Sequence, residues 1–305
     1  TDPLAETAAA GAELILTLSA SPFSLDKPAR REERFLKHAA RTDCPVVFAN
    51  QVGGNDELVF DGHSFVAADG SVRCRLSGFE PETATVDVPL DGSGGSVPRY
   101  DRSPAGQARA ALGLGIRDYF QKTGFDEAVI GMSGGIDSSV AATLAANALG
   151  ADSVYGVSLP SAVTRTRGGD DARAVAENLG IGFDVITVGG TVETVREAVG
   201  ENATRLTGVA VENLQARVRG DVLMSLANER DALVLTPDNK SEAAVGYCTL
   251  YGDAVGAIAP LGDCYKQLVY ALAAAFNDTP PAAVRTAPTA QTVRARPTRS
   301  RVPED

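Results

Sequence analysis

A glycine- and serine-rich run, Gly-Met-Ser-Gly-Gly-Ile-Asp-Ser-Ser at residues 131–139, joins two apolar segments of different character. Residues 128–130 precede it as a short apolar strand, and residues 138–149 continue from it as an alanine-rich helix. A strand that turns through glycines into a helix is the unit from which parallel, doubly wound sheets are built. The run therefore constrains the fold more than any other part of the chain.

The same run predicts a phosphate site. Gly134 and Gly135 lack a Cβ atom, so an anion can approach the backbone closely. The amides that open the following helix are unpaired, and the helix dipole adds about half a positive charge there. Asp137 would repel phosphates unless a divalent cation lies between them, which predicts Mg²⁺. Hydroxyl donors are offered by Ser133, Ser138 and Ser139.

The loop contains no lysine, so it differs from the loops that assist transfer of a γ-phosphate. A cradle for pyrophosphate as a leaving group indicates attack at the α-phosphorus of ATP and an adenylylated product. In this respect the loop resembles that of the ATP pyrophosphatase superfamily. The alternative is an ordinary glycine–serine turn between a strand and a helix.

Composition narrows the class of protein. The chain has 305 residues, enough for two domains, and its formal charge of −11 argues against nucleic acid as a partner. Its four cysteines and two histidines show no metal-ligand spacing, which predicts a reduced, zinc-free protein of the cytoplasm. It has no apolar run near 18 residues, so no membrane span is expected. A chain that begins Thr-Asp-Pro is expected to be processed or to be part of a longer one.

Four regions are predicted along the chain: a first domain at 1–90, a linker at 91–106, a second domain at 107–280 and a poorly ordered tail at 281–305. The first domain is expected to contain a hairpin in which residues 58–60 and 64–67 pair around an Asp61-Gly62 turn. Its other expected elements are a helix at 28–42 and strands at 12–20, 46–49, 72–76 and 83–88.

Strands and helices alternate beyond the linker. Helices are expected at 107–123, 138–149, 169–179, 191–199 and 208–229, and strands at 128–132, 153–159, 183–188 and 232–235. Strands separated by helices of this length predict a parallel, doubly wound sheet. Ligands of such sheets bind at the carboxyl ends of the strands, where the glycine-rich run lies.

Two further segments supply polar side chains near this edge. Asn213 and Arg217 are four residues apart, so they share one face of the long helix and suit a ligand bearing carboxylate or phosphate. Glu242 follows a strand closely and can share a cation with Asp137. The alternatives are a solvated helix face for the first pair and an ordinary first helical turn for Glu242.

A third segment contains Asp253, in a turn after Gly252, and then Lys266. A mobile lysine of this kind can neutralise pyrophosphate as it leaves. Taken alone, each of the two charges is more simply interpreted as a surface residue.

Together with the loop, these segments resemble the ammonia-ligase domain of NAD⁺ synthetases over residues of about 100–290. The matching motifs, in family order, lie at residues 115–125, 131–139, 212–219, 239–242, 246–253 and 259–266. Residues 18–23 and 47–62 resemble the carboxyl half of the glutaminase domain of glutamine-dependent NAD⁺ synthetases. The resemblance implies a partial nitrilase-like α/β sandwich followed by a doubly wound, adenine nucleotide alpha-hydrolase-like (ATP pyrophosphatase) domain, truncated at both ends.

The implied reaction is ATP-dependent amidation of deamido-NAD⁺ to NAD⁺ through an adenylylated intermediate, in a homo-oligomer. The resemblance makes Asp137 and Lys266 catalytic, and Asp137 and Glu242 ligands of Mg²⁺. Deamido-NAD⁺ would be held by Asn213, Arg217, Glu242 and Asp253. ATP would be held by Gly131, Met132, Ser133, Gly134, Gly135, Ile136, Asp137, Ser138, Ser139, Pro237 and Lys266.

Several departures from the family pattern qualify this expectation. None of the four cysteines occupies the place of the glutaminase nucleophile, so ammonia rather than glutamine is the expected nitrogen donor, although Ser21 and Lys27 match the glutamine pocket. Pro237 and Asp238 replace a Thr-Gly pair, residues 162–169 are unusually basic, and no basic carboxyl-terminal segment is recognisable. The alternatives are another adenylylating ligase and a catalytically impaired homologue that acts as a nucleotide-binding or assembly subunit.

Overall fold

The chain forms two compact units in a computed structural model, which describes residues 2–88, 97, 100–161 and 167–278. The first unit comprises Thr1–Tyr119 and the second Phe120–Asp305. The predicted tail and part of the predicted linker lie outside the described residues, so the four predicted regions stay predictions. None of the described helices is long and apolar enough to span a membrane.

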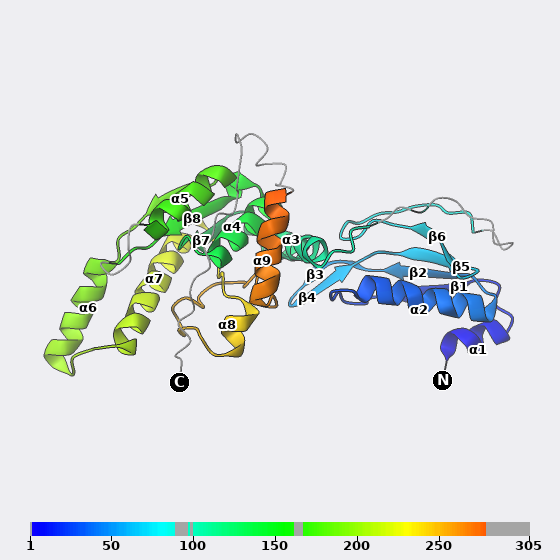
Figure 1. The fold of residues 1–305 in the computed structure, drawn as a ribbon, viewed down its shortest axis with the longest axis horizontal. Helices are drawn as coiled ribbons and strands as arrows, with labels where there is room; N and C mark the ends of the chain where they lie inside the picture. Colours follow the sequence, from blue (N-terminus) through cyan, green and yellow to red (C-terminus); the bar gives the residue numbers. More distant parts are fainter. Residues whose placement is uncertain (1, 89–96, 98–99, 162–166, 279–305) are drawn as a thin grey trace. The chain divides into compact units, whose positions relative to one another are not determined.

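The first unit contains a four-stranded sheet in the order β1-β2-β5-β6 and a separate β3-β4 hairpin (Figure 1). In the sheet, β1 is parallel to β2, whereas the pairs β2-β5 and β5-β6 are antiparallel. The elements are α1 (Pro3–Ala9), β1 (Ile15–Ser19), α2 (Lys27–Thr42), β2 (Val46–Asn50), β3 (Val52–Asn55), β4 (Leu58–Asp61), β5 (Phe65–Ala68), β6 (Ser71–Arg75) and the start of α3 (Pro104–Thr123).

Helix α2 covers one face of this sheet. Alternate residues of the strands, among them Ile15, Val46 and Phe48, point to the helix and form an apolar cluster with Ala39. Leu16 and Leu18 alternate with Ile15 along β1 and are 65% and 86% exposed. One face of the sheet is therefore packed, and the first strand carries large apolar side chains on the other.

Two predictions for this unit are wrong. Residues 58–61 do not pair with residues 65–68, because β4 pairs with β3 across a two-residue turn in which Asp56 has a φ of +51°. The chain does bend at Gly62, but there it passes from the hairpin to the four-stranded sheet, where β5 joins β2. Residues 83–88 form no strand within the described part of the chain.

The second unit contains a sheet in the order β10-β7-β8-β9, and all three neighbouring pairs are parallel. The parallel α/β architecture predicted from the alternation is thus confirmed. The elements are β7 (Ala128–Gly131), α4 (Ile136–Leu149), the short 3₁₀ helix η1 (Ala151–Ser153), β8 (Val154–Ser158), α5 (Arg167–Leu179), β9 (Gly182–Val185), α6 (Gly189–Asn202), α7 (Val209–Arg230), β10 (Leu233–Leu235), α8 (Lys240–Ala244) and α9 (Lys266–Asp278).

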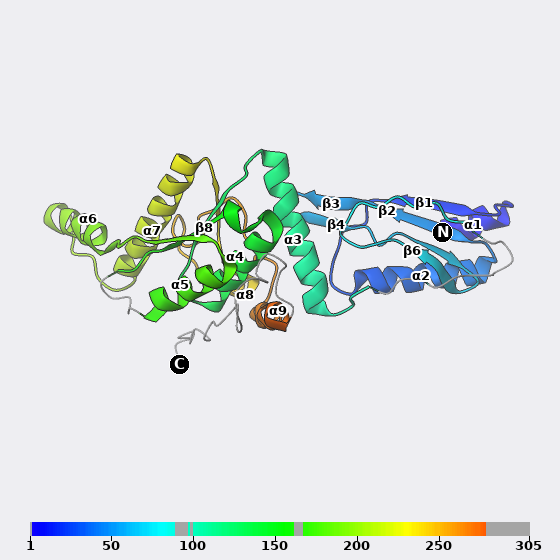
Figure 2. The same cartoon turned by 90° about the horizontal axis from the view of Figure 1, so that it is seen from above.

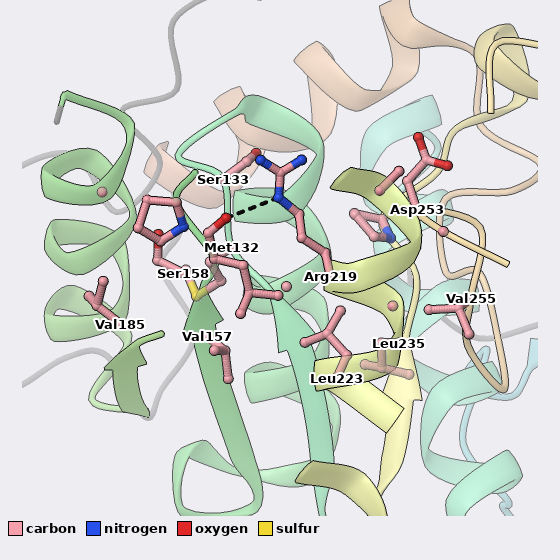
Figure 3. A pocket seen from close by; sticks show the side chains of 18 of the residues that line it. Met132, Ser133, Val157, Ser158, Val185, Arg219, Leu223, Leu235, Asp253 and Val255 are labelled. Carbon is pink, nitrogen blue, oxygen red and sulfur yellow. Dashed lines mark hydrogen bonds between the residues drawn. The ribbon is translucent and has the colours of Figure 1, made fainter. Parts of the chain in front are cut away.

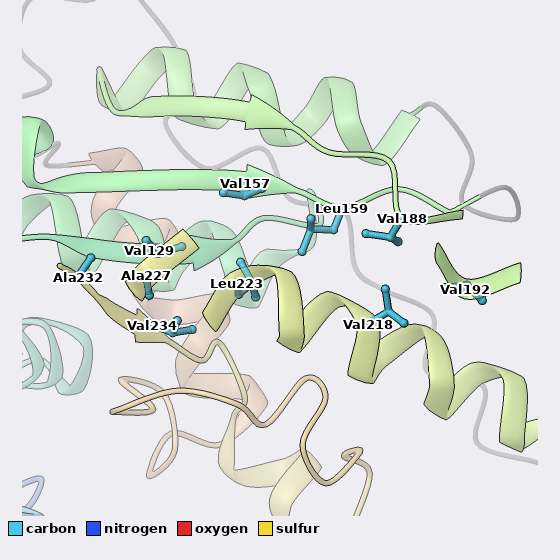
Figure 4. Packing of buried hydrophobic residues seen from close by; sticks show 10 residues of the cluster. All are labelled: Val129, Val157, Leu159, Val188, Val192, Val218, Leu223, Ala227, Ala232 and Val234. Atoms are coloured by element: carbon cyan, nitrogen blue, oxygen red, sulfur yellow. The ribbon is translucent and has the colours of Figure 1, made fainter. Parts of the chain in front are cut away.

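Helices cover both faces of this sheet. Figure 2 shows α4, α5 and α9 on one side and α7 on the other. The apolar cluster between α7 and the sheet combines strand residues such as Val129 and Val157 with helix residues such as Leu223 and Ala227 (Figure 4). Buried strands of this kind explain why residues 128–130 and 154–157 are almost wholly apolar.

The strand order reverses at β7, because β8 and β9 follow on one side while β10 returns to the other. In doubly wound sheets, ligands bind outside the carboxyl ends of the strands at such a reversal. The segments that leave the sheet there are the glycine-rich turn after β7 and residues 236–239 after β10. These two segments begin the candidate site.

Candidate active site

The turn between β7 and α4 is held together by its own serine side chains. The amide of Ser133 donates to Ser138 Oγ at 3.3 Å, and the amide of Gly135 donates to Ser133 Oγ at 3.2 Å. The hydroxyls of Ser138 and Ser139 donate to the Gly135 carbonyl at 3.1 and 2.8 Å. Gly134 has a φ of +77°, in the region that favours glycine. The hydroxyls predicted as phosphate donors thus also shape the turn itself.

The first turn of α4 offers backbone amides to an anion. Its N-cap residue is Gly135, and no side chain within the described residues caps it. Uncapped amides at the start of a 14-residue helix, together with the helix dipole, favour a negative charge. This geometry agrees with the predicted phosphate cradle.

Two carboxylates and one lysine meet beside this turn. Lys266, at the start of α9, forms an ion pair with Asp137 Oδ2, and its Nζ lies 3.8 Å from Glu242 Oε1. Asn239 Nδ2 donates to Asp137 Oδ1 at 3.0 Å. The structure therefore brings together three predicted site residues, although Asp137 and Lys266 lie 129 positions apart in the sequence.

A cavity of about 580 Å³ opens at the same edge of the sheet (Figure 3). Of the predicted ATP residues, the lining includes Gly131, Met132, Ser133 and Pro237. The apolar part of the remaining wall includes Val157 of β8, Leu223 of α7 and Leu235 of β10. An apolar hollow beside an anion cradle suits a ligand that combines a flat ring with phosphates.

Arg219 is a cavity residue that the sequence did not single out. Its Nε donates to the Leu159 carbonyl at 2.9 Å, as drawn in Figure 3, and burial lowers the pKa of its guanidinium. It lies two residues after Arg217, which is exposed and faces away on the helix. Residues two positions apart in a helix point to nearly opposite sides, so the spacing of Arg217 and Arg219 within residues 212–219 indicates that they face different surroundings.

The predicted substrate residues gather around one loop. Asn213 Oδ1 accepts from the Thr249 hydroxyl at 2.9 Å, and Arg217 Nε donates to the Leu250 carbonyl at 3.2 Å. Asp253 Oδ1 accepts from the Thr249 amide at 2.6 Å. Asp253 also lines the cavity. Asn213 and Arg217 thus hold the loop between α8 and α9 against α7, whereas Asp253 bonds within that loop, and contact of the three residues with a substrate stays a prediction.

Asp238 differs in its electrostatics from the other acidic residues of the site. It is half-buried, and burial, followed by the charges of Asp253 and Glu242, raises its pKa to about 6. A hydrogen bond with Thr236 opposes this shift only in part. The surroundings of Asp238, which replaces a glycine of the family pattern, therefore favour the protonated form of its carboxyl more than water does.

The cysteines are all free. Burial raises the pKa of the Cys44 and Cys74 thiols, and it raises that of Cys264 to about 11. Because the thiolate is the nucleophilic form, these environments do not activate a nucleophile.

Family models match almost the whole chain. Residues 109–302 match the model described as NAD synthase, which is more than half of the chain. The chain belongs to the NAD synthase family. Residues 3–95 of this NAD synthase family member match the model described as carbon–nitrogen hydrolase. The two-part resemblance predicted from the motifs is confirmed.

Individual relatives agree with the family models. The chain is 40% identical over 284 residues to the glutamine-dependent NAD(+) synthetase of Synechocystis sp., covering 90% of the chain and 50% of that relative. The chain therefore spans about half the length of the glutamine-dependent relatives it matches.

Solved structures show the same likeness. The structure of glutamine-dependent NAD+ synthetase from Acinetobacter baumannii in complex with adenosine diphosphate has a TM-score of 0.86 and 33% identity, covering 92% of this chain and 54% of that one. NH3-dependent NAD synthetase from Campylobacter jejuni has a TM-score of 0.53 and 28% identity, covering 57% of this chain and 74% of that one. The partial nitrilase-like and ATP pyrophosphatase-type fold predicted for this NAD synthase family member is thereby confirmed.

Proposed function

We propose that this chain amidates deamido-NAD⁺ to NAD⁺, with ATP as co-substrate. In the first step, a nicotinate carboxylate oxygen attacks the α-phosphorus of ATP, and the bond to the bridging oxygen of pyrophosphate breaks. In the second step, ammonia attacks the acyl carbon, the carbon–oxygen bond to AMP breaks, and the proton lost from nitrogen passes to water. Membership of the family supports this reaction.

The observation that carries the proposal is the meeting of Asp137, Glu242 and Lys266 beside the uncapped start of α4. The amides of α4 would receive the phosphates, and Lys266 would offset charge on the departing pyrophosphate. The cavity lined by Met132, Leu223 and other apolar side chains would take the nucleoside. These roles depend on groups from α4, α7, α8 and α9, which lie far apart in the sequence.

The carboxylates of Asp137 and Glu242 fit a bound Mg²⁺. Both are partly buried, with side-chain exposures of 15% and 31%, and both face the ammonium of Lys266. Mg²⁺ usually binds through one or two carboxylates together with phosphate oxygens. Once bound, it would neutralise charge on the pyrophosphate oxygens.

Deamido-NAD⁺ would contact the loop that Asn213 and Arg217 hold against α7. Arg217 is exposed there, although its Nε also binds the Leu250 carbonyl. Its remaining donors suit a phosphate or carboxylate. Asp253 lines the cavity and borders the same loop, so it would lie between the two substrates.

Ammonia is the proposed nitrogen donor of this chain, since none of its four cysteines matches the glutaminase nucleophile. The likeness in fold to the NH3-dependent synthetase of Campylobacter jejuni, over 57% of this chain, supports this choice. In a longer protein, glutamine could supply the ammonia through the domain of which residues 3–95 are part.

We further propose a homo-oligomer that acts in the cytoplasm. Four large side chains in the loop after α8, namely Val245, Tyr247, Leu250 and Tyr251, are between 69% and 83% exposed. An exposed apolar group of this size is typical of a protein interface. Light scattering coupled to gel filtration gives the subunit number directly.

The test of the proposed activity is NAD⁺ formation from deamido-NAD⁺, ATP, Mg²⁺ and ammonium chloride, followed by chromatography of the nucleotides. We expect NAD⁺, AMP and pyrophosphate in equal amounts, and no NAD⁺ when glutamine replaces ammonia. Lys266→Met should reduce the rate by about 100-fold, since it removes the cation nearest the leaving group.

A matched control is Lys122→Met, which makes the same substitution in α3, outside the candidate site. Its rate should stay within about twofold of the original. A folded chain that binds magnesium nucleotide but yields no NAD⁺ at high ammonia would favour the alternative of a catalytically impaired nucleotide-binding subunit.

A further inference from the structure

Asn239 is fully buried, with 0% exposure, and it contacts both members of the acidic pair, Asp137 and Glu242. It follows β10 and forms the N-cap of α8. Because it lies between Asp137 on one side and Glu242 on the other, its hydrogen bonds decide how both carboxylates are turned.

The side chain of Asn239 uses both ends of its amide. Its Oδ1 accepts from the amides of Ser241 and Glu242 at 2.9 and 3.2 Å, which caps the helix. Its Nδ2 donates to Asp137 Oδ1 at 3.0 Å, across 102 positions of the sequence. A single planar group therefore couples the start of α8 to the first turn of α4.

The backbone of Asn239 constrains the second carboxylate. Its amide donates to Glu242 Oε2 at 3.3 Å and completes a capping box. Asp137 Oδ1 and Glu242 Oε2 are thus both occupied by Asn239. The two oxygens that remain, Asp137 Oδ2 and Glu242 Oε1, are the ones that face the ammonium of Lys266. That ammonium, which is ion-paired with Asp137, lies where these two oxygens converge.

We propose that Asn239 is a positioning residue that aims one oxygen each of Asp137 and Glu242 at a common divalent cation. This inference rests on the proposed function, because it concerns the cation of the nucleotide site. A residue that only caps α8 would affect the stability of the helix. A residue that aims the carboxylates must also affect the affinity for the cation, because ligands oriented in advance lose less freedom on binding.

The test separates capping from aiming. Asn239→Ser keeps a good N-cap, since serine caps as well as asparagine does, but its hydroxyl is too short to cap and to reach Asp137 as well. We expect its melting temperature to stay within a few degrees of the original. In calorimetric titrations with Mg²⁺ and a nonhydrolysable ATP analogue, its dissociation constant for the cation should rise about tenfold.

Kinetics provide a second readout. In the ammonia-driven reaction, the apparent KM of Asn239→Ser for Mg²⁺ should rise by a similar factor, while kcat at saturating Mg²⁺ largely recovers. The matched control is Asn202→Ser, the same substitution at an exposed amide that donates to the Ala198 carbonyl at the end of α6. It should leave both the dissociation constant and the KM within about twofold of the original.

A folded Asn239→Ser variant with unchanged cation affinity would overturn the proposal and leave Asn239 as a helix cap. If the serine variant does not fold, Asn239→Thr, which also caps, takes its place under the same expectation. If neither folds, the side-chain amide signal of Asn239 in ¹⁵N spectra must shift when magnesium nucleotide is added, and an unmoved signal overturns the proposal. Absence of any nucleotide binding by the original chain would instead count against the proposed function.

Discussion

The side chain of Asp238 lies in an environment that opposes its ionisation. Partial burial and the neighbouring carboxylates of Asp253 and Glu242 raise its pKa to about 6, from an ordinary value of 3.8. The folded chain therefore binds a proton here more tightly than the unfolded chain does. The free energy of unfolding should fall as the pH rises from about 4 through 6, because the folded state then has to accept a charge that it disfavours.

Asp238→Asn should remove this penalty. Two pKa units correspond to nearly 3 kcal/mol, but the side chain is only half-buried, so we expect a gain of about 1 kcal/mol at pH 8. The gain should vanish near pH 4, where the carboxyl is protonated in both states. Urea unfolding at the two pH values measures the difference.

The exposed Asp221 of α7 offers the same substitution as a control. Asp221→Asn should alter the free energy of unfolding by less than about 0.5 kcal/mol. If Asp238→Asn stabilises the chain no more at pH 8 than at pH 4, then neither burial nor the neighbouring charges raise the pKa of Asp238.

At the scale of elements, α7 is in close contact, through small residues, with the loop between α8 and α9 near Asp253. A Cβ atom on Gly252 would lie 2.8 Å from Ala216 Cβ, and one on Gly220 would lie 3.0 Å from the Gly252 carbonyl oxygen. The loop can therefore approach the helix this closely only because two glycines face each other.

Gly252→Ala should push the loop away from α7. Overpacking of this kind costs about 1–3 kcal/mol of stability. Since Asp253 is the next residue, we also expect the KM for deamido-NAD⁺ to rise about tenfold, which corresponds to 1.4 kcal/mol. Thermal unfolding and steady-state kinetics give the two numbers.

Gly200 in α6 provides the comparison, because a Cβ atom there would meet nothing within 4 Å. Gly200→Ala should raise the stability by up to about 1 kcal/mol through helix propensity alone, without a change in KM. Equal behaviour of the two alanine variants would refute the close contact between the loop and α7.

The elements of the second unit could be predicted from the sequence better than those of the first. Its buried parallel strands are short apolar runs, and long helices separate them, so both the elements and the sheet type follow from local pattern. The pattern also indicated which edge carries the site, because the glycine-rich run follows a strand directly.

In the first unit, the local sequence pattern did not predict which strands pair, because the pairing joins strands that are not neighbours in the sequence. Asp61-Gly62 is a strong turn signal, and the chain does bend there, but a bend does not state which strand comes next in the sheet. Residues 83–88 alternate like a strand, yet no partner lies beside them in the described part of the chain. The hydrogen bonds of Asn239 to Asp137 and of Arg219 to Leu159 could not be predicted for a similar reason, since each joins segments far apart in the sequence.

At the scale of the whole molecule, large apolar side chains are exposed in both units, and in the first unit two of them lie on one strand. Leu16 and Leu18 project from β1, which is the first strand of its sheet in the described part of the chain. Exposed apolar edge strands favour association. The family model for this region is carbon–nitrogen hydrolase, and the glutamine-dependent relatives are about twice as long as this chain.

Replacing both leucines with lysine should reduce self-association of the chain. We expect lower static light scattering at high concentration for the Leu16→Lys, Leu18→Lys variant. Ammonia-driven NAD⁺ formation should be unaffected, because every residue assigned to the site lies in the second unit. Val209→Lys adds charge at another exposed apolar residue, 67% accessible, and should reduce the scattering much less. Equal scattering by the two variants would mean that net charge alone controls solubility.

The serine-bound turn after β7 has a consequence for the rate at which nucleotide is captured. Ser133, Ser138 and Ser139 already hold this turn through hydrogen bonds to its own backbone. The turn therefore has its binding conformation before the anion arrives, and no segment has to become ordered on binding. Little conformational entropy is then lost on association. Diffusion and the loss of hydration water should then limit the rate at which nucleotide binds. Rapid-mixing traces of nucleotide binding should show a single fast phase.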